Sequence, residues 1–294
     1  MIAATSAPPV ARTADVAAAA QLACLLEVSS PKPGNVTPAH AFHDTSYADF
    51  LASAVAIGPA IAAAGEQPLG VTVRSAITAT RRWTQANTNL GIVLLLAPLA
   101  RAALTMGDRP LRDAVRATLA DTTIADARAV YAAIRLAAPG GLGTVPAQDV
   151  SQPPSVSLTE AMHHARARDA VAREYATGFA VTFDIGAPAL KRARGDGLSW
   201  SDAIVETYLT LLAEQPDTHI ARKLGDAAAR EVQDGARTTL AAGGVRRGAG
   251  RDALGALDRA LRDPANRRNP GATADLTTAA IFVTLLDGGP DASA

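Results

Sequence analysis

Aromatic residues, cysteine and net charge are all scarce in this chain of 294 residues. Phe, Trp and Tyr together make up 4% of the sequence, and Cys24 is the one cysteine, so neither an internal disulfide nor a multi-cysteine zinc site can form. Basic and acidic residues number 28 each, which gives a formal net charge of zero. That balance argues against a nucleic-acid or membrane-surface footprint over the whole molecule.

The chain also lacks the patterns of a leader or a membrane span. Residues Met1 to Pro9 contain no basic n-region followed by an apolar run, which a signal peptide would require. The longest apolar run, Gly91 to Ala100, ends at Arg101 and is shorter than the roughly 20 residues that cross a bilayer. We therefore expect a cytoplasmic protein.

Apolar residues, many of them alanine, are abundant and recur at helical spacing. They make up 48% of the chain, and no segment alternates as a strand would, so we predict an all-α fold with one multi-helix, bundle-like domain. The alanine-rich faces would also allow a homodimer. The expected helices cover residues 16–27, 45–61, 71–83, 90–104, 110–137, 158–173, 175–194, 199–214, 218–242, 252–261 and 270–286.

Two segments are expected to lie outside the helices. Residues 1–12 are predicted to form a flexible tail. Residues 138–157 are rich in Pro, Gly, Gln and Ser, and a loop of that length usually serves as a lid or a linker. We interpret it as a lid.

The most informative segment begins the last helix. Pro270 suits a first helical turn and Asn269 suits its cap. Asp275 shares a helix face with Ala279 and Phe282, where a carboxylate needs a partner. It is either a satisfied structural aspartate or a ligand group at the electropositive start of a core helix.

Two other polar clusters flank expected helices. Lys32 and Asn35 surround a Pro-Gly turn, which is either an anion cradle or an ordinary surface turn. Asn87, Thr88 and Asn89 stand before a buried helix, whose free N–H groups suit phosphate. Capping needs one polar residue rather than three, so we favour a binding role here.

Two histidine-containing clusters suggest metal or phosphate chemistry. His40, His43 and Asp44 form a His-x-x-His-Asp pattern like that of helical metal phosphohydrolases, although Asp44 could equally cap the next helix. Farther along, His219 and Lys223 are spaced i,i+4 beside Arg222, just after Asp217. The second cluster suits a polyphosphate or a magnesium–phosphate ligand, or else is a solvated charged face.

Five short motifs occur in an order that resembles triphosphoribosyl-dephospho-coenzyme A synthases, over roughly residues 22–286. They are Lys32-Pro33-Gly34, the His40/Asp44 cluster, Asn87-Thr88-x-x-Gly91, Glu174-x-x-x-Gly178-Phe179 and Pro270-Gly271-x-x-Ala274-Asp275-Leu276. The resemblance implies an all-helical transferase that moves the triphosphoribosyl group of ATP to the 2′-hydroxyl of 3′-dephospho-coenzyme A and releases adenine.

The resemblance also suggests roles for particular residues. The expected substrate-binding residues are Lys32, Asn35, Asn87, Thr88, Asn89, His219, Arg222, Lys223, Asn269 and Thr273. Mg²⁺ is expected on Asp44, Asp217 and Asp275, and the catalytic group on Glu174, His40 or Asp275, with Glu174 or His40 as general base. The loop from Gly140 to Ser157 would close over ATP to exclude water.

The sequence departs from the citrate lyase members of the family and leaves alternatives open. It has Asn89-Leu90 where those members read His-Lys, and its Asp217 to Lys223 stretch is similar to archaeal and methyl-compound-using relatives. A different acceptor, in the biosynthesis of a methanopterin- or methanofuran-type one-carbon carrier, is therefore a second hypothesis. A metal-dependent phosphohydrolase built on His43-Asp44 and a non-catalytic binding protein are the others.

Overall fold

The computed structural model describes residues 13–141 and 143–288, so the expected tail at residues 1–12 lies outside the described residues. The all-α prediction is confirmed, because the described part contains helices and, apart from an isolated bridge between Thr37 and His40, no extended pairing. The α-helices are α1 (Thr13–Ser29), α2 (Tyr47–Ala56), α3 (Gly58–Ala62), α4 (Leu69–Thr80), α5 (Leu90–Thr105), α6 (Leu111–Ala120), α7 (Ile124–Ala137), α8 (Leu158–Ala165), α9 (Ala170–Thr177), α10 (Ala187–Gly195), α11 (Trp200–Glu214), α12 (Thr218–Leu224), α13 (Asp226–Ala241), α14 (Gly248–Leu261) and α15 (Gly271–Gly288). Shorter helical turns are η1 (Ala63–Gly65), the π-helix η2 (Thr182–Gly186) and η3 (Gly244–Arg246).

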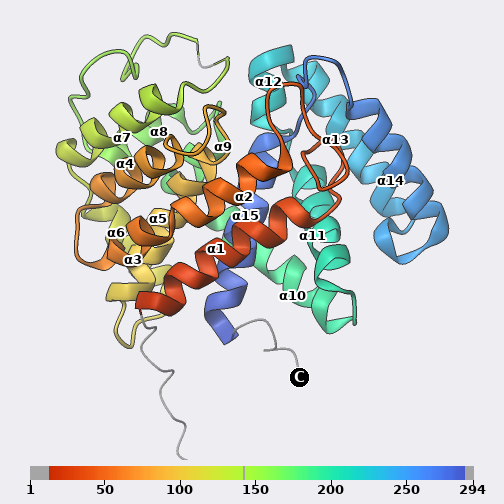
Figure 1. Cartoon of the computed structure of the whole chain (residues 1–294), viewed down its shortest axis with the longest axis horizontal. Coiled ribbons are helices and arrows are strands. Elements are labelled where there is room, and N and C mark those ends of the chain that lie inside the picture. The colour runs from red at the N-terminus through yellow and green to blue at the C-terminus, as the bar shows by residue number, and fades with distance from the viewer. Residues whose placement is uncertain (1–12, 142, 289–294) are drawn as a thin grey trace, which may run out of the picture.

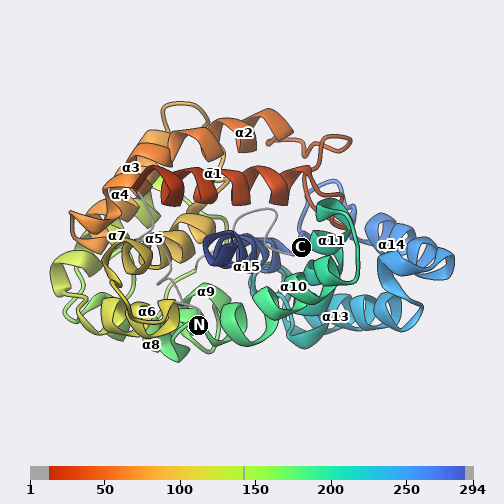
Figure 2. The same cartoon turned by 90° about the horizontal axis from the view of Figure 1, so that it is seen from below.

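The last helix, α15, lies in the middle of the molecule, with α1 and α2 on one side of it and α9 and α10 on the other (Figures 1 and 2). It packs against α1, α5 and α11. Its side chains are buried on several faces, as Leu276, Ile281 and Phe282 show. A helix that is apolar nearly all round is normally surrounded by protein, so the expected burial is confirmed.

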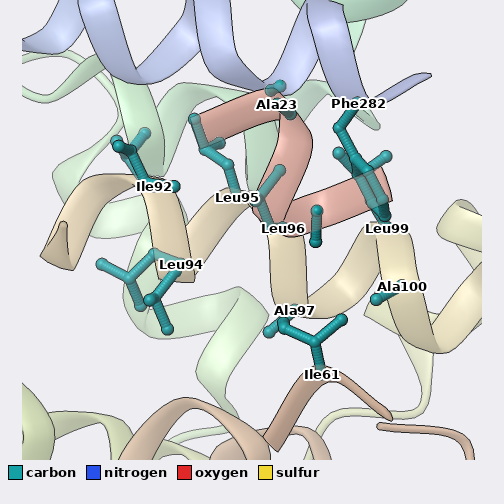
Figure 3. Close-up of a cluster of buried hydrophobic side chains, with 14 of the residues drawn as sticks. Ala23, Ile61, Ile92, Leu94, Leu95, Leu96, Ala97, Leu99, Ala100 and Phe282 are labelled. Carbon is teal, nitrogen blue, oxygen red and sulfur yellow. The ribbon is translucent and has the colours of Figure 1, made fainter. Parts of the chain in front are cut away.

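Two hydrophobic clusters hold the helices together. The larger one centres on α5, where Leu95, Leu96 and Leu99 are fully buried beside Ala23 of α1 and Phe282 of α15 (Figure 3). The smaller cluster joins α11 to α12, α13 and α14. The segment after α8 and the segment before α13 both line the cavity described below, which lies near the boundary between the two clusters.

Several helices that the sequence predicts as single are broken. The segment 110–137 divides into α6 and α7, because α6 ends at its C-cap Asp121 and Thr123 caps α7 through Asp126. The segment 218–242 divides at Gly225, whose φ of +87° an α-helix does not allow. The segment 175–194 is interrupted at Gly178, which adopts a left-handed conformation, and again by the π-helix.

One helical stretch, Tyr47–Gly65, is long and apolar enough to cross a membrane among the described residues. It comprises α2, α3 and η1, and it packs against α1, α4 and α5. A helix of a folded core passes the same test, so the stretch is weak evidence for a membrane span.

Candidate active site

The polar residues singled out in the sequence surround one cavity of about 710 Å³. Its walls come from the end of α1, the start of α5, the segment from α7 to α9, the start of α12 and the start of α15. Eight of the expected site residues line it: Asn35, Asn87, Thr88, Asn89, His219, Arg222, Asn269 and Asp275. The other seven lie elsewhere: Lys32, His40, Asp44, Glu174, Asp217, Lys223 and Thr273.

Asp275 lies in the second turn of α15 and lines the cavity. Its carboxylate has no hydrogen-bond or ion-pair partner among residues 13–141 and 143–288, so it is not the satisfied structural aspartate of the first interpretation. Burial raises the pKa of Asp275 well above its usual range, and the negative charges of Glu27 and Asp217 raise it further. A carboxyl group with a raised pKa and no partner is suited to exchange a proton.

The first turn of α5 makes room for this carboxylate. A Cβ at Gly91 would lie 2.0 Å from Oδ2 of Asp275, so only glycine fits there. The polar residues that precede α5 make hydrogen bonds to other protein groups. Asn87 accepts a hydrogen bond from the Leu90 amide at 3.3 Å, Asn89 donates to Thr80 at 3.0 Å, and Thr88 bonds to Ser53. They shape the helix start, and their remaining polar atoms line the cavity.

His219, in the first turn of α12, approaches α15 in the same way. A Cβ at Gly271 would lie 2.3 Å from Nδ1 of His219. Burial, together with the charges of Lys223 and Arg222, lowers the pKa of His219 to about 3. The ring is therefore neutral at physiological pH and can act as a hydrogen-bond donor and acceptor, although not as a cation.

Four arginines line the cavity, and we call them the arginine wall: Arg168, Arg173, Arg222 and Arg230. They lie after α8, on α9, on α12 and on α13. Arg222 pairs with Asp169 at 3.4 Å, and its Nε is buried without a partner. Among the described residues, the other three make no ion pair. The arginine wall can therefore bind a polyanion.

The turn after α1 and the start of α15 are joined by amide hydrogen bonds. The side-chain amide of Asn269 donates to the Gly34 carbonyl at 2.9 Å and to the Asn35 side chain at 3.0 Å. Asn35 in turn donates to the Tyr208 hydroxyl at 2.9 Å. Asn269 therefore connects two segments and does not cap α15 as the sequence suggested.

Lys32 is not at a surface turn and does not line the cavity. It is fully buried, and its ammonium group contacts Glu27 Oε1 at 3.0 Å, the Ser30 carbonyl at 3.1 Å and the Glu27 carbonyl. These three acceptors match the three donors of an ammonium group. Glu27, at the end of α1, lies between Lys32 and the cavity, which it lines.

Asp217 and Thr273 have a structural task. Oδ1 of Asp217 accepts from the amides of His219 and Ile220, and Oδ2 accepts from the amide and hydroxyl of Thr273 at 2.8 Å each. Asp217 thus caps α12 and holds it against the first turn of α15. Each carboxylate oxygen of Asp217 already accepts two hydrogen bonds from the protein, so Asp217 is not placed to bind a metal.

The two residues expected as general base lie off the cavity. Glu174 is fully buried, and its two oxygens accept hydrogen bonds from the amides of Val181 at 2.9 Å and Thr182 at 2.8 Å. It stabilises the chain where α9 ends at Gly178. His40 is exposed, and its backbone pairs with Thr37.

The expected Mg²⁺ ligands do not meet. Asp44 is exposed beside His43, with 3.7 Å between Oδ2 and Nε2, while Asp217 is buried under α12 and Asp275 lines the cavity. Within the described ranges, no group of three or more His, Cys, Asp or Glu side chains could hold a metal ion. A phosphohydrolase centre built on His43 and Asp44 therefore lacks its ligand set here.

Lys223 lies off the cavity, near Asp44 and Asp263. Burial and the charge of Arg222 lower the pKa of Lys223, and the charges of the two carboxylates offset part of that fall.

The loop that follows α7 forms one wall of the cavity. Pro139, Gly140, Gln148 and Val150 line it. The Tyr131 hydroxyl donates to the Gln148 carbonyl at 2.6 Å, which ties the loop to α7. The loop therefore lies where a cover for the cavity would have to lie.

Sequence reasoning missed part of the site. Arg168 and Arg230 belong to charged helix surfaces, and nothing in their spacing distinguishes them from solvated arginines. His164 follows another histidine on α8, and nothing in the sequence marks it as a site residue, yet it lines the cavity. Glu27 could have been found, since it is a carboxylate at the end of an apolar helix with a lysine five residues later.

Comparison with known proteins shows which family the chain resembles. A family model described as ATP:dephospho-CoA triphosphoribosyl transferase matches residues 13–293. The chain is 28% identical to the 2-(5''-triphosphoribosyl)-3'-dephosphocoenzyme-A synthase of Klebsiella pneumoniae, over 90% of this chain and 92% of that protein. It is 34% identical over 119 residues to a protein of Pseudomonas fluorescens described as a probable synthase of the same name, and that match covers 40% of each chain.

A solved structure is also similar. The crystal structure of a protein from Archaeoglobus fulgidus, described as a triphosphoribosyl-dephospho-CoA synthase, aligns with a TM-score of 0.61 and 29% identity. The alignment covers 81% of this chain and 99% of that one. The chain therefore belongs to the ATP:dephospho-CoA triphosphoribosyl transferase family, whose model matches residues 13–293.

Proposed function

We propose that this protein transfers the triphosphoribosyl group of ATP to the 2′-hydroxyl of 3′-dephospho-coenzyme A and releases adenine. One observation carries the proposal: the unpartnered carboxylate of Asp275 and the arginine wall line the same cavity. A triphosphate needs cations to bind it, and the hydroxyl of the acceptor needs a base. The cavity offers groups suited to both requirements.

The arginine wall is the proposed site for the triphosphate. Guanidinium groups bind phosphate oxygens through paired, charge-assisted hydrogen bonds. Arg222, which the sequence predicts as a substrate-binding residue, lines the cavity and remains a candidate for binding the triphosphate. Lys32 is fully buried and does not line the cavity, so it is no longer a candidate. With the triphosphate held here, the ribose would extend toward Asp275.

The transferred unit keeps its triphosphate, so the bond that breaks joins ribose C1′ to adenine N9. The electron pair of that bond leaves with adenine, and the ribose passes through a state with oxocarbenium character, as in glycoside cleavage. The acceptor oxygen then bonds to C1′, and its proton goes to a base. Adenine takes up one proton as it leaves, so the reaction balances.

Asp275 is the proposed base. It is the one residue among the three expected catalytic groups that lines the cavity, and its raised pKa favours proton uptake. The neutral ring of His219 could accept or donate a hydrogen bond to the departing adenine or to the acceptor. The loop at 138–157 would keep water from C1′, since water there would hydrolyse ATP to adenine.

Mg²⁺ enters this proposal with the nucleotide. The protein offers no three-residue ligand set among the described residues, and Mg²⁺ commonly binds through substrate phosphates with few protein ligands. We therefore place it on the triphosphate and give it no protein cluster. A cytoplasmic location, the absence of nucleic-acid or membrane partners and a homodimer belong to the same proposal.

The test follows adenine by chromatography after the protein is mixed with ATP, Mg²⁺ and dephospho-coenzyme A. We expect adenine to form only when the acceptor is present, together with a product heavier than the acceptor by one triphosphoribosyl group. Phosphate or pyrophosphate release without adenine would support the phosphohydrolase alternative. Adenine that forms only with a pterin- or furan-type acceptor would support the second acceptor hypothesis.

A further inference from the structure

Among residues 13–141 and 143–288, Glu27 is the one other carboxylate on the α1–α15 side of the cavity, and the proposed reaction gives it no role. It lies at the end of α1, is 3% exposed and lines the cavity. Its charge contributes to the raised pKa of Asp275, and both residues line the same cavity. Helices α1 and α15, which carry them, pack directly together.

The environment of Glu27 differs from that of Asp275. Lys32 contacts Oε1 of Glu27 at 3.0 Å, and the same ammonium group is satisfied by two backbone carbonyls. Burial raises the pKa of Glu27 and lowers that of Lys32, and the charge of each group opposes the shift of the other, so the contact favours an ionised ammonium–carboxylate pair. No hydrogen bond to Oε2 occurs among the described residues, and Glu27 is one of the residues that line the cavity. Asp275 has no such cation in contact.

We propose that Glu27 is a second catalytic carboxylate, which stays ionised and stabilises the positive charge that develops on the ribose, and that Lys32 is its positioning residue. The inference rests on the proposed function. It divides the work between two neighbouring carboxyl groups, as glycoside-cleaving enzymes do: one holds a negative charge near the anomeric carbon, and the other moves a proton. Lys32 acts only through Glu27, because it does not line the cavity.

This assignment gives the Lys-Pro-Gly motif a physical purpose. The Pro33-Gly34 turn brings Lys32 back under the last turn of α1, and Gly34 fits there because a Cβ would lie 2.9 Å from Leu261. The Gly34 amide is also fixed by Asp258 at 2.8 Å. The turn therefore fixes the position of Lys32, whose ammonium group keeps Glu27 ionised. The turn does not bind an anion itself.

The first test compares Glu27→Gln with Glu206→Gln. Gln keeps the size and an acceptor for Lys32 and removes the negative charge. We expect kcat for adenine release to fall by about 100-fold or more, with KM for ATP changed by less than about threefold, because the charge matters in the transition state. Glu206 also pairs with a cation, Arg246 at 3.2 Å, but outside the cavity, and its variant should keep wild-type kcat.

The second test is a double-mutant cycle with Lys32→Met. If Lys32 acts through Glu27, the double variant Glu27→Gln/Lys32→Met will be no slower than Glu27→Gln alone. An additional loss of kcat in the double variant would overturn the positioning role. The double variant leaves no unpaired buried charge, so it remains informative even where Lys32→Met alone fails to fold.

A pH profile of Lys32→Met adds a readout that a purely structural role would not move. The groups near Glu27 are Lys32, Cys24, Tyr208 and Asp275. Without Lys32, the pKa of Glu27 rises, so the acidic limb of kcat should move to higher pH. A uniform loss at every pH would overturn the proposal.

The outcomes separate the two levels of inference. Wild-type protein that releases no adenine overturns the proposed function and the role of Glu27 together. Active wild-type protein whose Glu27→Gln variant keeps its kcat overturns the role of Glu27 alone.

Discussion

The two sides of the cavity are built in opposite ways. The side formed by α1, α5 and α15, which we call the carboxylate wall, carries Glu27 and Asp275 on buried helices whose neighbours are fixed by hydrogen bonds. The arginine wall carries cations on α9, α12, α13 and the segment after α8, and two of them, Arg168 and Arg230, are exposed. A buried charge needs a rigid surround to hold its geometry, whereas a mobile polyanion can be bound by flexible side chains.

Several residues in or beside the motifs that carry the family resemblance support the carboxylate wall. Lys32 fixes Glu27, Gly91 makes room for Asp275, and Asn269 ties the turn after α1 to α15. The arginines lie between the motifs. Short motifs therefore indicate where the scaffold is constrained, and the cations that would bind substrate are found only through the cavity.

The largest expected effect tests the carboxylate wall directly. Asp275→Asn removes the proposed base, so we expect kcat for adenine release to fall about 1,000-fold. The variant should also be more stable, because a carboxyl group whose pKa is raised by folding costs free energy at any pH above its unfolded pKa. Melting temperature and adenine release measure both effects. Asp287→Asn, on the exposed end of the same helix, is the control, and unchanged turnover in Asp275→Asn would remove Asp275 from the mechanism.

A steric change should affect the same wall without changing any charge. In Gly91→Ala the new Cβ would overlap Oδ2 of Asp275, so the carboxylate must move. Displacement of a catalytic group by about 1 Å can cost roughly 100-fold in rate, and we expect a loss of that order in kcat. Gly255→Ala on α14 is the matched control, because its Cβ would meet nothing closer than Arg259 Nη1 at 3.5 Å. Equal activities of the two variants would contradict the close fit.

A substitution in the arginine wall should weaken the binding of ATP without changing the rate of the chemical step. Arg230→Gln is expected to raise KM for ATP about tenfold and to leave kcat near the wild-type value, because an exposed cation contributes through long-range attraction. Added salt should reduce the difference between variant and wild type. Arg259→Gln, an exposed arginine outside the cavity, should leave KM unchanged. A fall in kcat with constant KM would place Arg230 with the catalytic groups.

The smallest expected effect lies where the two walls meet, at His219. Its pKa of about 3 in the folded protein is below the unfolded value of 6.5, so its contribution to stability is present above pH 6.5 and is lost as pH falls. Between pH 7 and pH 5 the loss is at most about 2 kcal/mol. Urea unfolding at both pH values should show a smaller drop for His219→Asn than for wild type. The exposed His163→Asn is the control, and equal drops in wild type and His219→Asn would show that the ring is not desolvated.

The sequence was sufficient for the fold class and for part of the site. The helical spacing of apolar residues predicts α1, α5 and α15 within a few residues, because their burial follows from their own composition. The breaks at Thr123 and Gly225 were missed, since a cap or a glycine inside a periodic pattern is a weak local signal. Asp275 could be singled out because a carboxylate on an apolar helix face is costly wherever the helix lies.

The amino-acid sequence alone determined that the chain is helical, that α15 is a core helix and that Asp275 on it needs an explanation. Only the tertiary structure decided that Glu174 and Asp217 are satisfied by backbone amides, that Lys32 is paired inside the protein and that four arginines share the cavity of Asp275. The reason is that a polar group's role depends on which partners reach it. Those partners come from segments up to 235 residues apart in the chain, and sequence spacing carries no record of their distance in space.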